Sequence, residues 1–398
     1  MADVTNYIDR LMAELCPGGV EYRPLGELLA YEQPTKYLVS SKDYDESYPT
    51  PVLTAGKTFI LGYTNETEGI YPASEEEPVI IFDDFTTAFK WVEFPFKAKS
   101  SAMKMLTLKS GTNSLFKYVY YAMQCIVYNS SDHARQWISK YSNIEIPVPP
   151  IEIQEAIVEI LDKFTNLEAE LEAELEARTL QYEYYRDSLL NSFSEPAVKF
   201  YPIEELFTTR NGYTPSKSNS SYWENGTVPW FRMEDIRENG RVLSEALQSV
   251  HESALKKGGM FPAGSVIVAT SATIGEHALI NVDFLCNQRF TVLTPKEEFK
   301  SLLLPKFLYY YSFVLDRWCL ANTTQSSFAS VDMKRFKKFE FPLPSLEEQQ
   351  RIVDILDRFD ALTTSLSEGL PAELAARRSQ YEYYRDQLLT FPRKGENQ

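Results

Sequence analysis

Two adjacent carboxylates, Asp83 and Asp84, end an apolar stretch in the string IIFDDF (80–85). Carboxylates at the end of a strand can hold a divalent metal ion for phosphodiester hydrolysis, and Lys90 and Glu93 lie close enough in sequence to complete such a site. The second half of the chain has no counterpart of this string. A turn or strand-end role is therefore the favoured interpretation, and we predict no metal site.

Other signatures of catalysis are absent. The chain contains no GxxxxGK[ST], GxSxG or HExxH string, and no Asn-Pro-Pro or Asp-Pro-Pro string of the kind expected in an adenine methyltransferase. The three histidines, His133, His251 and His277, are far apart in sequence, so each is more simply explained as a surface or core side chain. We predict no catalytic residue.

Cationic side chains are interleaved with aromatic residues in two stretches, residues 90–106 and 212–237. Lysine and arginine suit contacts to phosphate, while arginine and amide side chains can read base edges. Ser/Thr-rich loops at 129–137 and 322–330 add neutral phosphate donors. A solvated loop is the alternative for any single lysine, but interleaving in both halves favours nucleic-acid binding. The predicted DNA contacts are Lys57, Lys90, Lys97, Lys99, Lys104, Tyr213, Thr214, Lys217, Tyr222, Trp230, Arg232, Arg237, Gln288, Arg289, Lys334 and Arg335.

The elements that must position these residues are repeated along the chain. IPVPPIEIQEAIVEILDKF (146–164) aligns with FPLPSLEEQQRIVDILDRF (341–359), and VEYRPLGELL (20–29) aligns with VKFYPIEELF (198–207). Between the matched ends, residues 30–140 and 208–330 show no clear similarity, although both indicate mixed strand and loop. The strongest strand signals are residues 78–82 and 265–270. The chain is thus two halves, each a variable globular segment followed by a helical segment.

Each helical segment carries an apolar stripe with spacings of three and four, from Phe164 to Leu189 and from Phe359 to Leu388. Each segment is about 40 residues, or roughly 60 Å if continuous. The second segment is four residues longer than the first. Four residues turn a helix by about 400°, so this insertion preserves the packing face to within about 40°. We predict that the two segments pack antiparallel, with a local break or kink at 369–371.

The string QYEYYRD occurs twice, at 181–187 and 380–386. Packing along the helix seam is a sufficient explanation for Tyr182 and Tyr185, but it does not account for the polar residues that recur beside them. Two equivalent docking sites, for a partner present in two copies, would account for both. The predicted docking residues are Gln181, Tyr184, Arg186, Gln380, Tyr383 and Arg385.

Composition is that of a folded cytoplasmic protein with more than one domain. The 398 residues are 44% hydrophobic, the four cysteines form no CxxC pair, and no apolar run is long enough for a membrane span or signal peptide. The net charge of −16 by itself argues against a nucleic-acid partner, but the distribution of the charge along the chain matters more than the sum. Residues 151–195 hold 3 Lys+Arg against 12 Asp+Glu, whereas residues 196–345 hold 17 against 15. The acidity is therefore concentrated on a helix and does not prevent the globular segments from binding DNA.

This arrangement resembles the specificity (S) subunits of type I restriction–modification systems. The resemblance rests on the paired PxP…Q…IVxILDxF segments (147–164, 342–359) and the two QYEYYRDxLL strings (181–190, 380–389). The stretches 212–230 and CNQRF (286–290) resemble one class of target-recognition domain, and 51–64 with 78–91 resembles another. The match covers nearly the whole chain.

The resemblance implies an α+β fold in which two mixed α/β target-recognition domains (1–145, 196–340) are separated by two long antiparallel helices (146–195, 341–398), as a tandem repeat with a pseudo-twofold arrangement. It implies a non-catalytic DNA reader of a bipartite, asymmetric target. Two modification (methyltransferase) subunits and two restriction subunits would be its partners. S-adenosylmethionine, ATP and magnesium would be used by those partners, and this chain would hold no cofactor.

Two other functions share part of this pattern. A scaffold whose domains bind proteins would have the same repeat and helices, but would not retain duplex DNA in a salt-dependent manner. A stand-alone nuclease or a fused methyltransferase would need catalytic motifs that the chain lacks.

Overall fold

The chain folds into two compact units. The computed structural model describes residues 2–56, 58–128, 134–194, 196–324, 329–364 and 369–395. Unit 1 consists of Met1–Leu171 with Leu374–Gln398, and unit 2 consists of Glu172–Glu373. Each unit therefore combines one globular segment with helical residues from both repeats.

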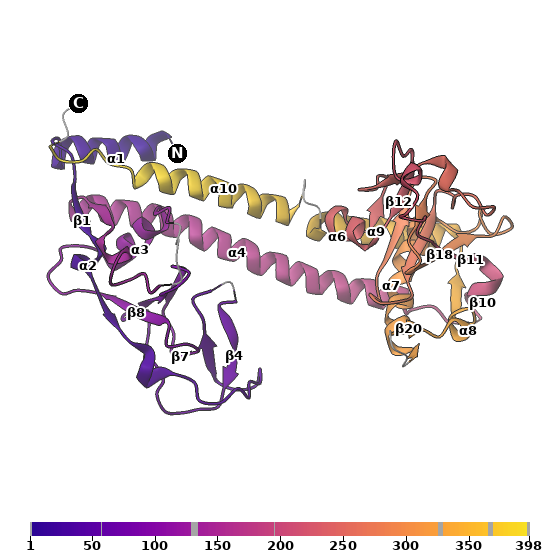
Figure 1. Cartoon of the computed structure of the whole chain (residues 1–398), viewed down its shortest axis with the longest axis horizontal. Coiled ribbons are helices and arrows are strands. Elements are labelled where there is room, and N and C mark those ends of the chain that lie inside the picture. The colour runs from indigo at the N-terminus through magenta and orange to yellow at the C-terminus, as the bar shows by residue number, and fades with distance from the viewer. Residues whose placement is uncertain are drawn as a thin grey trace. The chain divides into compact units, whose positions relative to one another are not determined.

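The globular part of unit 1 contains two sheets (Figure 1). The four-stranded sheet has the order β2-β8-β5-β6 and the three-stranded sheet has the order β4-β3-β7. All neighbours are antiparallel except β3 and β7, which are parallel. The strands are β2 (Leu29–Glu32), β3 (Thr50–Leu53), β4 (Ile60–Thr64), β5 (Val79–Asp83), β6 (Phe89–Val92), β7 (Lys97–Ala98) and β8 (Met103–Leu108).

The globular part of unit 2 has the same strand topology. Its larger sheet has the order β11-β18-β15-β16-β13 and its smaller sheet the order β14-β12-β17, again with one parallel pair, β12 and β17, in the smaller sheet. Strand β13, parallel to β16, is an addition relative to unit 1. The strands are β11 (Phe207–Asn211), β12 (Val228–Phe231), β13 (Val242–Leu243), β14 (Ser249–Val250), β15 (Ser265–Ala269), β16 (His277–Ile280), β17 (Leu285–Cys286) and β18 (Phe290–Pro295).

One inner strand of each larger sheet, β5 in unit 1 and β15 in unit 2, is buried on both faces. In β5, Ile80 and Phe82 join the core beneath the helices of unit 1, while Val79 and Ile81 join a second core beneath the smaller sheet. The β15 strand divides its residues between two cores of unit 2 in the same way. Alternate side chains of a strand point to opposite faces, so an uninterrupted apolar run is required at this position. The strands predicted at 78–82 and 265–270 are confirmed.

The helices follow the repeat. Helix α4 is continuous over 40 residues, as predicted for the first helical segment, whereas the second segment forms α9 and α10. Gly369, just before α10, has a φ of +82°, and a Cβ there would lie 2.5 Å from the carbonyl oxygen of Ala361. The interruption predicted at this glycine is confirmed, because only glycine adopts this φ without strain in so close a contact.

The bounds of the α-helices are α1 (Ala2–Leu15), α2 (Leu25–Leu28), α3 (Phe116–Gln124), α4 (Ile151–Leu190), α5 (Ile203–Leu206), α6 (Met233–Asn239), α7 (Pro305–Ala321), α8 (Met333–Phe336), α9 (Leu346–Thr364) and α10 (Leu370–Leu388). Three short ribbons complete the described elements: β1 (Glu21–Pro24) with β9 (Glu145–Val148), β10 (Lys199–Pro202) with β21 (Glu340–Leu343), and β19 (Thr323–Thr324) with β20 (Ser330–Val331). None of the helices in the described ranges combines the length and apolar character that a membrane crossing needs.

Repeated residues make repeated contacts. The buried amide of Gln154 donates to the carbonyl oxygen of Pro149 at 2.8 Å and accepts from the backbone N–H of Leu115 at 2.9 Å. Gln349 makes the same two bonds in unit 2, to Pro344 at 2.8 Å and from Leu304 at 2.8 Å. Each glutamine thus ties the first turn of its helix to the globular part of its unit.

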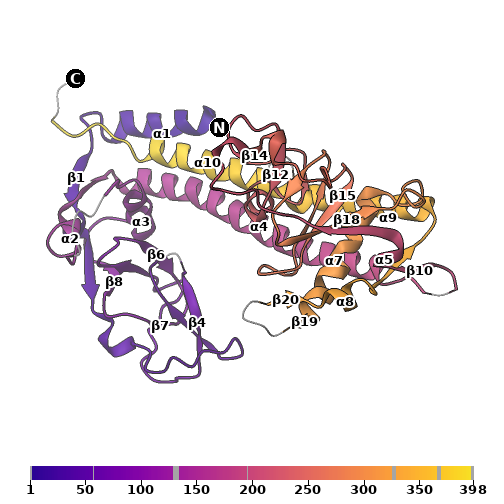
Figure 2. The same ribbon diagram turned by 45° about the vertical axis from the view of Figure 1, so that its right-hand side comes forward.

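The helix seam is built from aromatic residues of both repeats. In unit 1 the ring of Phe164 stacks 5.7 Å from that of Tyr384, and in unit 2 the ring of Phe359 stacks 5.5 Å from that of Tyr185. Four residues after Phe164, Glu168 forms an ion pair with Arg378 at 2.6 Å, and Arg378 lies six residues before Tyr384. Because the contacts move toward lower residue numbers in α10 as they move toward higher numbers in α4, the two helices run antiparallel in unit 1. Figures 1 and 2 both show α10 beside the first half of α4, with α1 against α10. The predicted antiparallel packing and the α+β fold class are confirmed.

Candidate nucleic-acid interface

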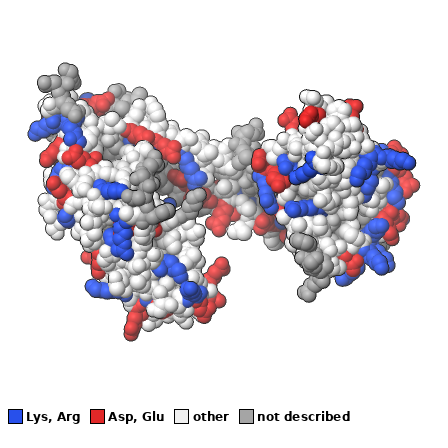
Figure 3. Space-filling model, in the orientation of Figure 1, with Lys and Arg blue, Asp and Glu red and all other residues white. Residues whose placement is uncertain are grey.

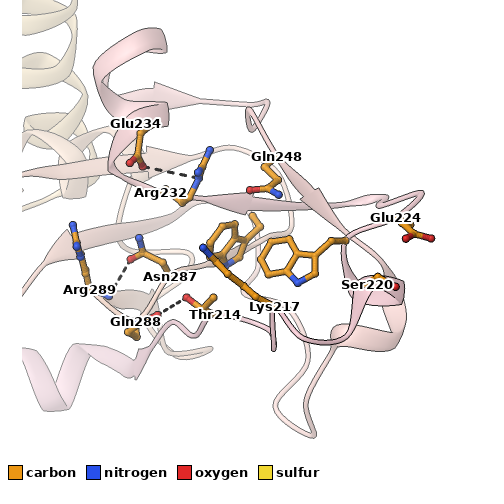
Figure 4. Close-up of a pocket in the computed structure, with 12 residues that line it drawn as sticks. Thr214, Lys217, Ser220, Glu224, Arg232, Glu234, Gln248, Asn287, Gln288 and Arg289 are labelled. Atoms are coloured by element: carbon orange, nitrogen blue, oxygen red, sulfur yellow. Dashed lines mark hydrogen bonds and ion pairs between the residues drawn. The ribbon is translucent and has the colours of Figure 1, made fainter.

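A cleft of about 650 Å³ opens in the globular part of unit 2 (Figure 4). Six of its twelve lining residues were predicted as DNA contacts from the sequence: Thr214, Lys217, Trp230, Arg232, Gln288 and Arg289. The other six are Ser220, Trp223, Glu224, Glu234, Gln248 and Asn287. Residues more than 70 positions apart in sequence are therefore brought to one site.

Gly212 allows the two segments of the cleft to meet. Its N–H donates to the carbonyl oxygen of Phe290 at 3.0 Å, and the next N–H, of Tyr213, donates to that of Cys286 at 2.7 Å. A Cβ on Gly212 would lie 2.3 Å from the carbonyl oxygen of Asn287, closer than any carbon and oxygen atoms pack. The loop that follows β11 thus lies directly on the segment between β17 and β18.

Replacing Gly212 with alanine is expected to separate these segments. The added methyl group cannot be accommodated without moving backbone, so we expect a destabilisation of about 1–3 kcal/mol and weaker binding of specific DNA by the assembled complex. Thermal unfolding and a DNA-binding titration measure the two effects. Gly259→Ala is the matched control for added side-chain volume in unit 2, since no atom lies within 4 Å of a Cβ there, although its φ of +63° adds backbone strain. Equal DNA affinity for Gly212→Ala and wild type would contradict the prediction.

Two tryptophans form one wall of the cleft. The rings of Trp223 and Trp230 pack edge to face with centres 5.1 Å apart. Their indole N–H groups donate to the carbonyl oxygens of Ser216 and Tyr213, at 3.1 Å and 3.0 Å. Because both indoles are held by backbone acceptors of the Gly212 loop, the wall is rigid and offers apolar surface beside polar groups.

The polar groups of the cleft are of the kinds that read base edges. The guanidinium of Arg232 lies 5.6 Å from the ring centre of Trp230, and its Nε is 4.0 Å from the carboxylate of Glu234. The amide oxygen of Gln288 accepts a hydrogen bond from the hydroxyl of Thr214 at 2.5 Å, which orients the amide group. Arginine pairs with guanine and glutamine with adenine through two hydrogen bonds each. Exposed Lys217 and Arg289 lie at the same cleft and suit phosphate.

Five other residues predicted in unit 2 are not at the cleft. Tyr213 and Tyr222 pack into the small core behind the tryptophan wall, and the hydroxyl of Tyr213 donates to the carbonyl oxygen of Ala254 at 3.0 Å. Arg237 lines a different cleft of unit 2. Lys334 and Arg335 are exposed on the short helix α8.

Two lysines predicted as DNA contacts in unit 1 are internal, and the prediction is wrong for both. The side chain of Lys104 is fully buried with its Nζ 3.1 Å from the carboxylate of Asp84. That of Lys97 is 4% exposed, with its Nζ 2.7 Å from the carboxylate of Glu66. Each ammonium group is occupied by an internal acid and is not accessible to phosphate.

The remaining predicted cations of unit 1 are accessible or lie outside the described residues. Lys90 is exposed on β6, and half-buried Lys99 donates to the hydroxyl of Tyr44 at 2.8 Å. Lys57 lies outside the described residues, as do 129–133 and 325–328 of the two Ser/Thr-rich loops. On the face drawn in Figure 3, Lys and Arg side chains of each unit are interspersed with Asp and Glu.

The aspartates of IIFDDF have structural roles. Asp83 accepts from the backbone N–H groups of Phe85 and Thr86, at 3.0 Å and 2.8 Å, and so closes the turn after β5. Asp84 holds Lys104 and accepts from the backbone N–H of Trp137 at 2.8 Å. The strand-end role favoured from the sequence is confirmed. Within the described part of the chain, no group of three or more His, Cys, Asp or Glu residues is arranged to hold a metal ion.

The predicted docking residues fall into two kinds. Tyr184 and Tyr383 are 70% and 59% exposed, so a partner can reach both. Arg186 and Arg385 instead lie mostly inside their units, where each pairs with the next aspartate and lies over a ring of the seam, Tyr182 or Tyr381. Gln181 and Gln380 accept hydrogen bonds from Arg178 and Arg377 on the same helix, at 2.8 Å and 3.1 Å.

Six cleft residues were absent from the predicted set, and three of them, Trp223, Asn287 and Gln248, have side chains that suit base recognition. Trp223 and Asn287 lie within the stretches 212–237 and 286–290, and their side-chain types signal base stacking and base reading. Gln248 lies outside both stretches in a loop before β14, and no local pattern marks it.

Comparisons with known proteins agree with this fold. Residues 17–177 and 197–376 match the family described as the type I restriction modification DNA specificity domain. The specificity subunit of the type I restriction enzyme EcoR124I/EcoR124II from Escherichia coli is 47% identical over 406 residues, which cover 98% of each chain. That of EcoprrI, also from E. coli, is 55% identical over 201 residues, covering 49% of this chain and 50% of the relative.

Solved structures share the fold. The S subunit of a type I restriction–modification system from M. genitalium superposes with a TM-score of 0.52 at 14% identity, covering 93% of this chain and 96% of the other. A chain from a structural study of complex assembly and conformational transition in the type I system superposes with a TM-score of 0.58 at 16% identity, covering 94% and 98%. The chain belongs to the specificity subunits of type I restriction–modification systems. It is a non-catalytic DNA recognition subunit with two specificity domains.

Proposed function

We propose that this chain reads a bipartite, asymmetric DNA target, with one half-site for each of its recognition domains, 1–145 and 196–340. The observation that carries this proposal is the cleft of unit 2, where a rigid tryptophan wall stands beside Arg232 and Gln288. The shared strand topology of the globular parts supports one reader per unit. The helical regions 146–195 and 341–398 would set the gap between the half-sites.

The same helical regions would bind two modification subunits. Tyr184 and Tyr383 support this role, since each is an exposed aromatic residue in a repeated string. Two restriction subunits would join the complex in the cytoplasm. S-adenosylmethionine would be used by the modification subunits, and ATP and magnesium by the restriction subunits.

Mapping of adenine methylation tests the reader role. DNA from cells that express this chain with its modification subunit is expected to carry one bipartite motif, which disappears when this chain is deleted. A methylated motif that survives the deletion, or an intact complex that methylates no motif, would contradict the proposal.

Replacing Arg232 with alanine is expected to relax one half of that motif. Loss of a two-bond contact to a base costs about 1–3 kcal/mol, which is about a tenfold to hundredfold loss of affinity for the specific site. The other half-site should keep its sequence, because unit 1 is unchanged. Methylation mapping of the variant measures both halves, with Lys300→Ala as the control for loss of an exposed positive charge in unit 2. An unchanged motif would remove Arg232 from the base contacts.

A further inference from the structure

A second cleft of unit 2, of about 900 Å³, lies apart from the cleft proposed to bind DNA, and of the predicted DNA contacts only Arg237 is among the residues described at it. It is lined by residues of α4, α7 and α9, by the segment from Ile236 to Val242, which runs from the end of α6 to the start of β13, and by Glu276 just before β16. It shares no residue with the cleft of Figure 4. Its helical wall includes Glu183, the neighbour of the exposed Tyr184.

Among the described residues, one tyrosine hydroxyl in this cleft makes no direct hydrogen bond. Tyr182 is 5% exposed and its Oη makes no hydrogen bond to any residue that the structure describes. The guanidinium of Arg186 lies over the ring, 5.4 Å from its centre, and partly offsets the burial that raises the pKa of this hydroxyl. A buried hydroxyl without a hydrogen bond costs about 1–3 kcal/mol, so this site favours a ligand that supplies one.

The equivalent tyrosine of unit 1 is satisfied within its own unit. Tyr381 donates to the amide oxygen of Gln124 at 2.6 Å. A shared contact aligns the two units at this point. The hydroxyl of Tyr121, three residues before Gln124, donates to the carboxylate of Asp162. In unit 2 the hydroxyl of Tyr310 donates to the carboxylate of Asp357, which is the equivalent of Asp162 in the repeat. The residue of unit 2 that stands three positions after Tyr310, and so corresponds to Gln124, is Phe313. Because a phenyl ring stands where unit 1 has an amide, the hydroxyl of Tyr182 lacks the acceptor that Gln124 provides for Tyr381.

The charges of the cleft select a cation. Its carboxylates are those of Glu183, Glu238, Glu276 and Asp360. Two of its three guanidiniums are already engaged by internal acids, since Arg186 pairs with Asp187 at 3.2 Å and Arg241 lies 3.6 Å from the carboxylate of Asp316.

The same carboxylates disfavour DNA at this cleft. Burial raises the pKa of Asp360, while Thr364, Lys306 and Arg241 act in the opposite direction. Of the three arginines at the cleft, only Arg237 is not paired with an acid that the structure describes, so phosphate would face four carboxylates and one such guanidinium, whereas a lysine or arginine side chain would be attracted by the carboxylates.

We propose that this cleft receives a basic side chain of one modification subunit, whose N–H groups donate to the Oη of Tyr182 and pair with the surrounding carboxylates. This inference rests on the proposed docking role of the neighbouring Tyr184. Since Tyr381 of unit 1 is internally bonded, the two modification subunits meet different docking surfaces and bind with different affinities.

Stepwise assembly tests the inference. Full-length chain is titrated with its modification subunit, and native mass spectrometry counts complexes with one and two copies at several salt concentrations. Glu183→Gln with Glu276→Gln is expected to weaken one of the two additions about tenfold and to flatten its salt dependence. Glu382→Gln, at the position of unit 1 that repeats Glu183, is the matched control and should leave that step unchanged.

The two tyrosines provide a second, independent comparison. Tyr182→Phe is expected to weaken the same addition without lowering the melting temperature, because no internal bond is lost. Tyr381→Phe is expected to lower the melting temperature, because it leaves the amide of Gln124 without its donor.

Three outcomes would overturn the inference. Both additions could be unaffected by the cleft variants while Tyr184→Ala weakens one, in which case only the cleft is wrongly assigned. The cleft variants could weaken DNA binding of a normally assembled complex, which would assign the cleft to nucleic acid. Failure of the wild-type chain to bind a modification subunit at all would overturn the docking proposal and this inference together.

Discussion

Assembly with the modification subunit is expected to weaken when Tyr184 and Tyr383 are both replaced by alanine, while the chain itself stays folded. Each ring is more than half exposed and packs against the next tyrosine, with ring centres 5.6 Å and 5.3 Å apart, and the hydroxyl of Tyr383 accepts a hydrogen bond from Gln387 at 2.8 Å. Truncating an exposed aromatic ring costs little stability, but a ring that anchors an interface contributes about 2 kcal/mol or more to binding.

Each modification subunit is therefore expected to bind about 30-fold more weakly to the double variant. Size-exclusion chromatography and a binding titration at fixed salt measure the loss, and thermal unfolding checks that the fold is intact. Ile138→Ala is the matched control, since this side chain of the globular part of unit 1 is 59% exposed. Normal assembly of the double variant would contradict the docking role of QYEYYRD.

Replacing Lys104 with methionine is expected to destabilise unit 1 more than any other single change proposed for this chain. Lys104 and Asp84 are both fully enclosed, and the ammonium group also lies 5.2 Å from the ring centre of Tyr31. Methionine fills the volume of the lysine stem but leaves the carboxylate of Asp84 buried without a counter-charge. Breaking a buried ion pair on one side costs about 3–5 kcal/mol.

Hydrogen exchange of β5 and β8 provides the local measurement, because Asp84 directly follows β5 and Lys104 lies on β8. The double variant Lys104→Met with Asp84→Asn should recover much of the stability, since asparagine can still accept from the N–H of Trp137. Lys90→Met, on the exposed side of β6, is the control and should be nearly neutral. A Lys104→Met protein as stable as wild type would show that the pair contributes no net stability.

The features that follow from the repeat could be predicted from the sequence. Residues that match between the halves make equivalent contacts, as Gln154 and Gln349 do, because the same local pattern places them at the same turn of a helix. The break at Gly369 was predictable for a similar reason, since glycine before Leu-Pro is a local signal. The seam between α4 and α10 followed from spacings of three and four.

What depended on distant partners could not be predicted. Lys97 and Lys104 stand in a stretch rich in cations and aromatic rings, yet both are inside because Glu66 and Asp84 reach them from other parts of unit 1. Gln248 joins the cleft only because the smaller sheet of unit 2 brings its loop there. The common strand order of segments 30–140 and 208–330 could not be predicted either, because many dissimilar sequences satisfy the side-chain packing of one topology.

The two-sided burial of β5 and β15 has an evolutionary consequence. One face of each strand belongs to the core that the helices share, and the other belongs to the core that supports the smaller sheet. In unit 2 the smaller sheet and the residues just after its strands supply Trp230, Arg232 and Asn287 to the cleft. Mutations can therefore accumulate on one side of a single strand and alter what is recognised, while the opposite side preserves the surface that holds the complex together. New DNA specificities can therefore arise without changes to the surface through which the complex assembles.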